Sequence, residues 1–260
     1  MKIGCNWSEA LFDLIRNKRV DIDYIKTFYS DHFENDFERM RSLKSILLHG
    51  VNYPINVGMK NINVVDFRQL NNLIHRCGSP HYGIHSFLPK DDVSPGMTDE
   101  DIHKYMSEHI QIFKKSLSVP LLIENMPDTR FEMAIFHPYF EAEKINRLVI
   151  DNDINLLLDL THARLTSSRN NWNLQDFLKD LPLERVKELH VNGSGYDELG
   201  FPDDTHQAMQ DRDYELLEWV LGYSKPEIIT LEYNGIASET FDIVSENLYQ
   251  QLTKLNNTLK

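Results

Sequence analysis

A recurring feature of the chain is a short apolar run that ends in, or is closely followed by, histidine, aspartate or glutamate. The segments Leu156–Arg164 (LLLDLTHAR) and Ile228–Gly235 (IITLEYNG) are examples. Apolar runs of this length are typical of buried strands. An acidic or imidazole group at the end of such a strand is costly to bury unless it is paired or bound to a metal ion. The nine residues in such positions are His49, His85, Glu124, Asp159, His162, His190, Asp204, His206 and Glu232.

This set predicts a metal centre with more than one ion. Three or four ligands are enough for a single ion, so nine candidates suggest two or three. Nitrogen and oxygen ligands suit iron, zinc and manganese alike, and the ligand types alone do not choose among them. For any one histidine, a hydrogen-bonded structural role is more common than ligation, so the prediction depends on the whole set. His162 could equally orient Asp159.

Eight strands separated mostly by helical segments must position these residues. Alternation of strand and helix eight times is typical of the (β/α)8 TIM barrel, an α/β fold. The carboxyl ends of its strands meet at one rim, which is the catalytic face of this fold. No linker divides the chain, so we expect residues 1–260 to form one TIM-barrel domain with the metal site at that rim. The expected strands are Lys2–Asn6, Asp23–Phe28, Ser45–Gly50, Tyr82–Ser86, Pro120–Met126, Asn155–Leu160, Val186–Asn192 and Glu227–Tyr233.

Capping residues predict where several helices begin and end. Ser8 is placed to cap the first helix, and Thr98 is followed three residues later by Asp101, as in a capping box. Glycine is common just after a helix, where the backbone turns left-handed. The further expected helices are Val64–Ile74, closed by Gly78, then Asp213 to Gly222, and finally Ser238–Leu259.

The composition is that of an ordinary globular protein, with 260 residues, 41% hydrophobic, 26% charged and a formal net charge of -13. The acidic balance disfavours a nucleic-acid partner, which needs a basic surface. The two cysteines are too few for a disulfide framework. The first residues lack a signal-peptide pattern, and no apolar stretch is long enough to cross a membrane. We therefore expect a cytoplasmic protein without a membrane partner.

Other polar residues near the rim are candidates for supporting roles. Asn125, Asn192 and Asn234 lie beside ligand candidates and are expected to orient them or to contact substrate. Arg164 is a candidate for binding an anionic substrate group, although a plain surface charge is the more common role. The remaining histidines are assigned surface or packing roles in helices, or in one case a position at the opposite end of its strand: His32, His75, His103, His109, His137 and, at that opposite end, His81.

The whole chain resembles the xylose-isomerase-like TIM-barrel superfamily, and two branches match in detail. The ligand order resembles that of the endonuclease-IV type of trinuclear zinc phosphodiesterase, including an Asp-x-x-His and an Asp-x-His element. That resemblance implies one ion held by Glu124, Asp159, His190 and Glu232. It implies a second ion held by His49 and His85, with Glu124 bridging, and a third held by His162, Asp204 and His206.

The second branch is the uncharacterised-domain family that contains the multinuclear iron oxidase of methanobactin biosynthesis. The segments that resemble it are Leu48–Val51 (LHGV), Glu124–Pro127 (ENMP), Leu156–Asp159 (LLLD), Asp204–His206 (DTH) and Asp211–Gly222 (DRDYELLEWVLG). The resemblance implies oxidative modification of cysteine in a ribosomally made peptide, generally with a partner protein. The chain departs from this family at Thr161-His162, where an asparagine pair is common.

The leading functional prediction is therefore a multinuclear enzyme, with iron favoured and zinc or manganese as alternatives, that oxidises a peptide cysteine or a small thiol. Glu124 and Glu232 are the predicted catalytic carboxylates, with Glu124 bridging two ions, and no general base is assigned. The alternatives are an endonuclease-IV-like zinc phosphodiesterase and a metal-dependent sugar isomerase or epimerase. A binding protein with a structural metal fits less well, because structural sites are usually closed by four ligands.

Overall fold

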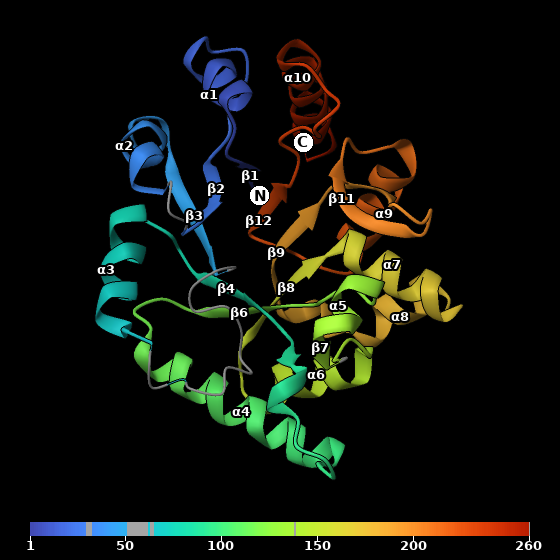
Figure 1. Ribbon diagram of the computed structural model, residues 1–260. Helices are drawn as coiled ribbons and strands as arrows, with labels where there is room; N and C mark the ends of the chain where they lie inside the picture. Colours follow the sequence, from blue (N-terminus) through green and yellow to red (C-terminus); the bar gives the residue numbers. More distant parts are fainter. Residues whose placement is uncertain (30–32, 51–61, 63–64, 138, 260) are drawn as a thin grey trace.

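The computed structural model of the protein describes residues 1–29, 33–50, 62, 65–137 and 139–259. Parallel strands close into a barrel in the order β1-β12-β9-β8-β6-β4-β3-β2, and Figure 1 shows them surrounded by helices. This confirms the predicted (β/α)8 TIM barrel. Each strand ends within two residues of its predicted bounds. The barrel strands are β1 (Lys2–Asn6), β2 (Tyr24–Phe28), β3 (Ser45–Gly50), β4 (Tyr82–His85), β6 (Leu121–Glu124), β8 (Asn155–Asp159), β9 (Val186–Val191) and β12 (Ile228–Leu231).

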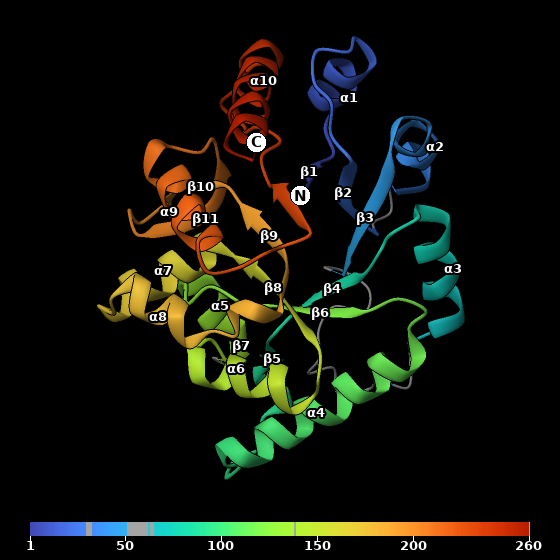
Figure 2. The same ribbon diagram turned by 180° about the vertical axis from the view of Figure 1, so that it is seen from behind.

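The helices cover the outside of the barrel, as Figure 2 shows from behind. No helix in the described ranges is both long and apolar enough to cross a membrane. Two short antiparallel pairs lie outside the barrel: β5 (Leu88–Pro89) with β7 (Phe136–His137), and β10 (Gly193–Tyr196) with β11 (Pro202–Gln207). The α-helices are α1 (Glu9–Arg16), α2 (Phe33–Leu43), α3 (Phe67–Cys77), α4 (Asp99–Ser116), α5 (Arg130–Ile135), α6 (Ala142–Asp151), α7 (Leu160–Asn170), α8 (Leu174–Asp180), α9 (Asp211–Leu221) and α10 (Phe241–Thr258).

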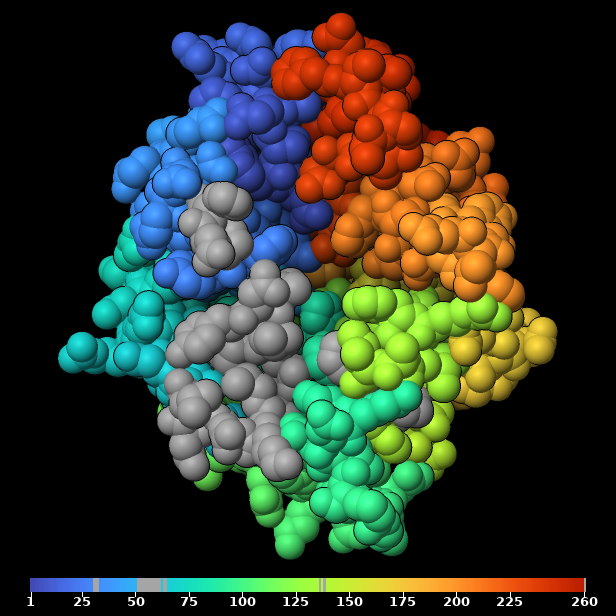
Figure 3. All heavy atoms as spheres, in the orientation of Figure 1, coloured from blue at the N-terminus to red at the C-terminus, as the bar shows by residue number. Residues whose placement is uncertain are grey.

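The first and last helices pack side by side where the barrel closes. Leu11 and Leu14 of α1 and Leu248 and Leu252 of α10 are buried in the common core. Their apolar positions recur at helical spacing, which places them on one face of each helix. In Figure 3 the blue and red ends of the chain meet at the top of the molecule. The β1–β12 pairing beneath these helices joins the two ends of the sheet.

The predicted capping residues mostly have their expected roles. Ser8 caps α1 by accepting a hydrogen bond from the Leu11 amide, and Thr98 and Asp101 form a capping box at α4. Gly78 ends α3 with a φ of 66°, a left-handed conformation that glycine adopts without a steric penalty. Asp213 is not the first residue of α9 as predicted. It is the third, and its carboxylate accepts the backbone N–H of the capping residue Gln210.

Three further predictions need correction, and three residues named in predictions fall outside the described residues. Residue 65 precedes α3, which is capped by Asp66 and begins at Phe67. The last helix begins at Phe241, because Thr240 caps it. His137 pairs with Leu88 in the β5–β7 sheet and is therefore not helical. His32, Val51 and Val64 lie outside the described residues.

The register of the barrel brings the ends of neighbouring strands to the same level. His85 on β4 is the register partner of Glu124 on β6, and Asp159 on β8 is the partner of His190 on β9. Next to them, His49 on β3 faces Gly83 on β4. A Cβ atom at Gly83 would lie 2.9 Å from Leu157 and 3.3 Å from the His49 ring, so a glycine leaves room for both side chains.

Candidate metal centre

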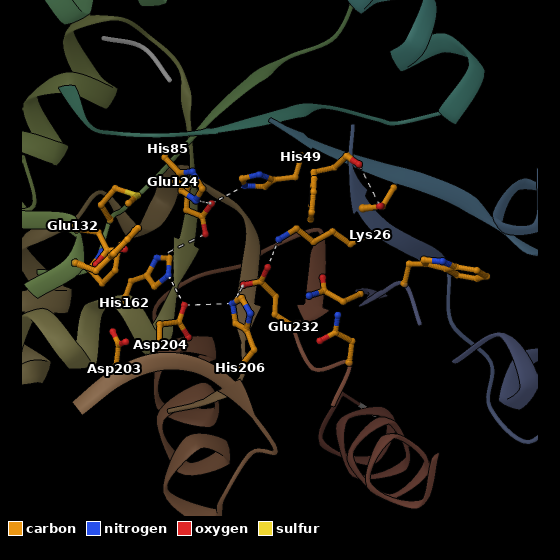
Figure 4. A pocket seen from close by; sticks show the side chains of 18 of the residues that line it. Lys26, His49, His85, Glu124, Glu132, His162, Asp203, Asp204, His206 and Glu232 are labelled. Carbon is orange, nitrogen blue, oxygen red and sulfur yellow. Dashed lines mark hydrogen bonds and ion pairs between the residues drawn. The ribbon is translucent and has the colours of Figure 1, made fainter. Parts of the chain in front are cut away.

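Two groups of buried donor atoms meet at the carboxyl-terminal rim of the barrel strands. One consists of His49, His85 and Glu124, and the other of Glu124, Asp159, His190 and Glu232. Within each group, one ligand atom from every residue lies within 4.8 Å of the others. We call them the three-donor group and the four-donor group. Figure 4 shows Glu124 between the two histidines of the first group and the rest of the site.

Glu124 joins the two groups because both of its carboxylate oxygens are engaged. Its Oε2 lies 2.6 Å from His49 Nε2 and 3.1 Å from His85 Nε2. Its Oε1 lies 2.9 Å from His190 Nδ1. Burial alone would raise the pKa of Glu124, but the three imidazoles hold it well below its usual value. The carboxylate is therefore charged and faces two separate positions, which is the geometry of a bridging ligand.

A third set of candidate ligands, His162, Asp204 and His206, lies next to these groups. Asp204 Oδ2 is 3.0 Å from His162 Nε2 and 3.3 Å from His206 Nε2. Burial alone would lower the pKa of His206, but Asp204 raises it to about 9. His206 has a φ of 46°, which is uncommon for a residue other than glycine and often marks a functional site. This set is looser than the two groups above, which alone meet the 4.8 Å limit in the described part of the chain.

Asp159 connects the four-donor group to the start of α7. As the capping residue of that helix, its Oδ1 accepts the backbone N–H of His162 at 2.7 Å. The His162 ring itself faces Asp204 rather than Asp159, whose Oδ2 lies 3.9 Å away. Asp159 therefore orients His162 through the backbone, while the ring contacts the Asn125 carbonyl through Nδ1 and Asp204 through Nε2.

The site has the buried, incompletely paired polar atoms that a metal ion would satisfy. Asp159 Oδ2 and His49 Nδ1 are buried without a hydrogen-bond partner. Burial and the nearby carboxylates, chiefly Glu232, raise the pKa of Asp159 to about 7. Burial and the ammonium of Lys26 lower the pKa of His49 to about 4, so its ring is neutral and able to bind metal. A cation among these groups would neutralise the carboxylates and satisfy the unpaired oxygen.

Comparison with known protein families decides between the two resemblances described above. The family of the RiPP precursor modification enzymes MbnB/TglH/ChrH matches residues 2–255. The chain belongs to this family. The predicted resemblance to the family of the methanobactin-biosynthesis oxidase is thereby confirmed.

Relatives of this MbnB/TglH/ChrH family member cover only part of its sequence. A UPF0276 protein of Acaryochloris marina is 28% identical over 177 residues, which are 65% of this chain and 62% of that protein. A UPF0276 protein of Bordetella pertussis is 28% identical over 152 residues, 56% of this chain and 51% of that protein. The chain thus spans about half to two thirds of the length of these curated relatives.

Solved structures with the same fold span nearly the whole chain at low identity. The D-psicose 3-epimerase of Clostridium cellulolyticum has a TM-score of 0.64 and 12% identity, covering 100% of both chains. A xylose isomerase domain protein of Alicyclobacillus acidocaldarius has a TM-score of 0.65 and 14% identity, covering 99% of both. The IOLI protein, solved with a zinc atom, has a TM-score of 0.66 and 16% identity, covering 98% of this chain and 96% of its own. These likenesses confirm the TIM-barrel fold of this family member.

The three asparagines that were predicted to support the site differ from one another in their contacts in this family member. Asn125 pairs with the backbone of Asp159 on both sides: its Oδ1 accepts the N–H at 2.8 Å, and its Nδ2 donates to the carbonyl at 3.0 Å. Asn192 donates to Asp204 Oδ1 at 2.7 Å and so orients that carboxylate. Asn234 is exposed and lines the pocket over the donor groups.

Arg164 is not brought to the pocket. Its guanidinium is hydrogen-bonded to Asp213 of α9 and, at 3.0 Å, to Ser194 Oγ. It is not among the residues that line the pocket over the donor groups. Its contacts join α7 to α9 and to the β10–β11 hairpin. Sequence spacing could not show this, because it depends on where α9 lies against α7.

Two charged residues at the site were not singled out from the sequence. Lys26 is only 7% exposed, and its Nζ is hydrogen-bonded to Glu232 Oε1 and lies 3.5 Å from His190 Nδ1. Glu188 lies two residues before His190 on β9, so both side chains are on the same face of the strand. Its Oε1 is 3.4 Å from His190 Nε2, and its Oε2 is 2.5 Å from His81 Nε2. The available signal was a charged residue inside a strand: Lys26 is the one charge in YIKTF, and Glu188 follows Lys187 in VKELHV.

An Asn125→Ala variant is expected to unfold about 2–3 kcal/mol more easily than the wild type, because it leaves the buried N–H and carbonyl of Asp159 without partners. Urea unfolding followed by circular dichroism measures this change. Asn234→Ala is the matched control, since Asn234 is exposed at the same rim and is expected to change stability by less than about 0.5 kcal/mol. Equal stabilities for the two variants would show that the hydrogen bonds of Asn125 to the backbone of Asp159 do not stabilise the fold.

Proposed function

We propose that the chain is a multinuclear iron enzyme that oxidatively modifies a cysteine thiol, either in a peptide or in a small molecule. The observation that carries the proposal is the pair of buried donor groups that share Glu124 at the base of an open pocket. Membership of a family of RiPP precursor modification enzymes supports a peptide substrate. A partner protein that presents the peptide belongs to the same proposal.

Each donor group has a role in this proposal. Glu124, Asp159, His190 and Glu232 hold one ion, and His49 and His85 hold a second, with Glu124 as the bridge. His162, Asp204 and His206 hold a third. The fit of these residues to a cation rests on the unpaired Asp159 oxygen and on the neutral His49 ring. Bound iron supplies the electron-transfer chemistry that amino-acid side chains lack.

The pocket above the donor groups suits a peptide segment with an apolar side. It has a volume of about 650 Å³, and its floor holds the shared carboxylate Glu124 together with His49, His85 and Glu232. Apolar side chains, including Trp7, Phe28 and Phe131, form part of its walls. Apolar walls position a substrate and exclude water from charged groups on the floor. The chain would therefore bind and orient the substrate next to Glu124 and Glu232.

The alternative proposal is a metal-dependent sugar epimerase. The observation in its favour is the placement of two carboxylates, Glu124 and Glu232, around His190: His190 Nδ1 is 2.9 Å from one and 3.2 Å from the other. A pair of carboxylates beside a metal ion can remove a proton from carbon and return one. The phosphodiesterase alternative has less support, because the net charge of -13 disfavours an acidic polymer.

The two proposals predict different products. Protein loaded with iron, given oxygen and a cysteine-containing precursor peptide with its partner protein, is expected to change the mass of the peptide. A peptide with serine in place of that cysteine is the matched control and is expected to remain unchanged. Unmodified peptide together with interconversion of ketohexoses would overturn the thiol-oxidation proposal and favour the epimerase.

A further inference from the structure

Lys26 brings a positive charge into the four-donor group. Its side chain extends from β2 toward Glu232, as Figure 4 shows. The Nζ atom is hydrogen-bonded to Glu232 Oε1 and lies 3.5 Å from His190 Nδ1. It therefore contacts two of the four residues that make up this group.

The ammonium is held there by charge and burial together. Lys26 is 7% exposed and Glu232 is 5% exposed, so little water reaches the pair. Burial alone would lower the pKa of Lys26, but Glu232 and Glu124 raise it above its usual value, and the side chain stays charged. A buried carboxylate left without a partner is strongly unfavourable. Without a metal ion, the His190 imidazole and the Lys26 ammonium together offset the charge of Glu232 and hold its pKa well below the usual value.

A metal ion and the ammonium cannot both hold this position. Lys26 binds one Glu232 oxygen, Oε1, and its Nζ lies 3.5 Å from His190 Nδ1, while the other oxygen, Oε2, lies 3.2 Å from the same nitrogen. Two cations a few ångströms apart in a buried site repel each other strongly. The three-donor group differs, since in the described part of the chain His49 and His85 contact Glu124 Oε2 directly, and Lys26 acts on His49 only through its charge.

We propose that Lys26 is an internal counter-cation for Glu232, and that an ion enters the four-donor group only by displacing the Lys26 ammonium from this carboxylate. This inference rests on the metal centre described under the proposed function. Lys26 then sets the metal affinity of the four-donor group and the order in which the two donor groups bind their ions. The three-donor group binds its ion first and more tightly, and the four-donor group fills second.

The test compares metal-free wild-type protein with Lys26→Met and Lys26→Arg, titrated with Co²⁺ alone and followed by its visible absorption and by calorimetry. Methionine keeps the length of the side chain and removes its charge, whereas arginine keeps the charge. Lys26→Met is expected to bind the second ion about tenfold more tightly or better, with the first ion changed less than about threefold. Lys26→Arg is expected to bind both ions within about threefold of wild type.

Stability of the metal-free protein provides an independent readout. Lys26→Met is expected to melt at a lower temperature without metal, because Glu232 Oε1 then loses its hydrogen-bonded ammonium. Adding Glu232→Gln to Lys26→Met is expected to recover part of this loss, since the double variant has no unpaired charge at this position. If Lys26→Met raised the affinity for both ions equally, the effect of the charge would be general and the proposal would be overturned. Unchanged or weaker binding of the second ion would overturn it as well. Wild-type protein that binds no Co²⁺ at all would instead refute the metal centre itself.

Discussion

Glu124→Gln is expected to lose two metal ions together and to reduce activity by more than about 100-fold. The reason is that one carboxylate serves both donor groups: its Oε2 faces His49 and His85, and its Oε1 faces His190. Glutamine has the same shape but only one oxygen and no charge. It cannot neutralise two cations, and its amide nitrogen cannot bind a metal ion in place of the lost oxygen.

The measurement is the ratio of metal to protein after purification without chelator. Glu132→Gln is a matched control, because Glu132 lines the same pocket but belongs to neither donor group. This control is expected to retain the wild-type metal content. Loss of a single ion from Glu124→Gln, with the other retained at full occupancy, would contradict the bridging role of Glu124.

Asp159→Asn is expected to stabilise the metal-free protein while weakening its binding of metal. Burial and the neighbouring carboxylates raise the pKa of Asp159 to about 7, so the charged form is unfavourable in the folded state without an ion. Asparagine removes this charge. It is also as good a helix cap as aspartate, so the hydrogen bond to the His162 amide is retained.

The sign of the pH dependence follows from the direction of this shift. Between the usual pKa of about 4 and the raised value of about 7, the folded metal-free protein binds a proton that the unfolded chain has released. The contribution of Asp159 to stability therefore falls as the pH rises through this window. Asp159→Asn is expected to gain on the order of 2–4 kcal/mol over wild type at pH 8 and almost nothing at pH 4.

Thermal unfolding of the metal-free proteins at pH 4, 6 and 8 measures this difference. The same proteins with metal are expected to show the reverse order, because the wild-type carboxylate binds the ion and the amide binds it weakly. If Asp159→Asn were less stable than wild type at pH 8 without metal, the charge of Asp159 would not destabilise the folded protein.

The barrel and the convergence of the ligand candidates were predictable from local patterns. Apolar runs that end in His85, Glu124, Asp159 and His190 have strand length, and parallel strands bring their carboxyl ends to one rim. No knowledge of distances is needed for that step. The fold thus follows from the spacing of strands and helices, and the position of the site follows from the polar residues at the strand ends.

Contacts that depend on how side chains pack across the barrel were not predictable. Lys26 lies in the middle of the strand sequence YIKTF, and its pairing with Glu232, which follows β12 and is 206 residues away, becomes visible only in the closed barrel. Arg164 was expected at the rim as a substrate contact, but the position of α9 pairs it with Asp213. In both cases the decisive partner comes from a distant part of the chain.

The proposed function requires that this chain hold a multinuclear iron centre bridged by Glu124. Native mass spectrometry of the full chain, purified without oxygen or chelator, tests it most directly because it counts the ions on each molecule and identifies them by mass. The predicted result is two or three ions per chain, with iron as the metal. Chains that carry a single ion, or zinc alone, would contradict the account.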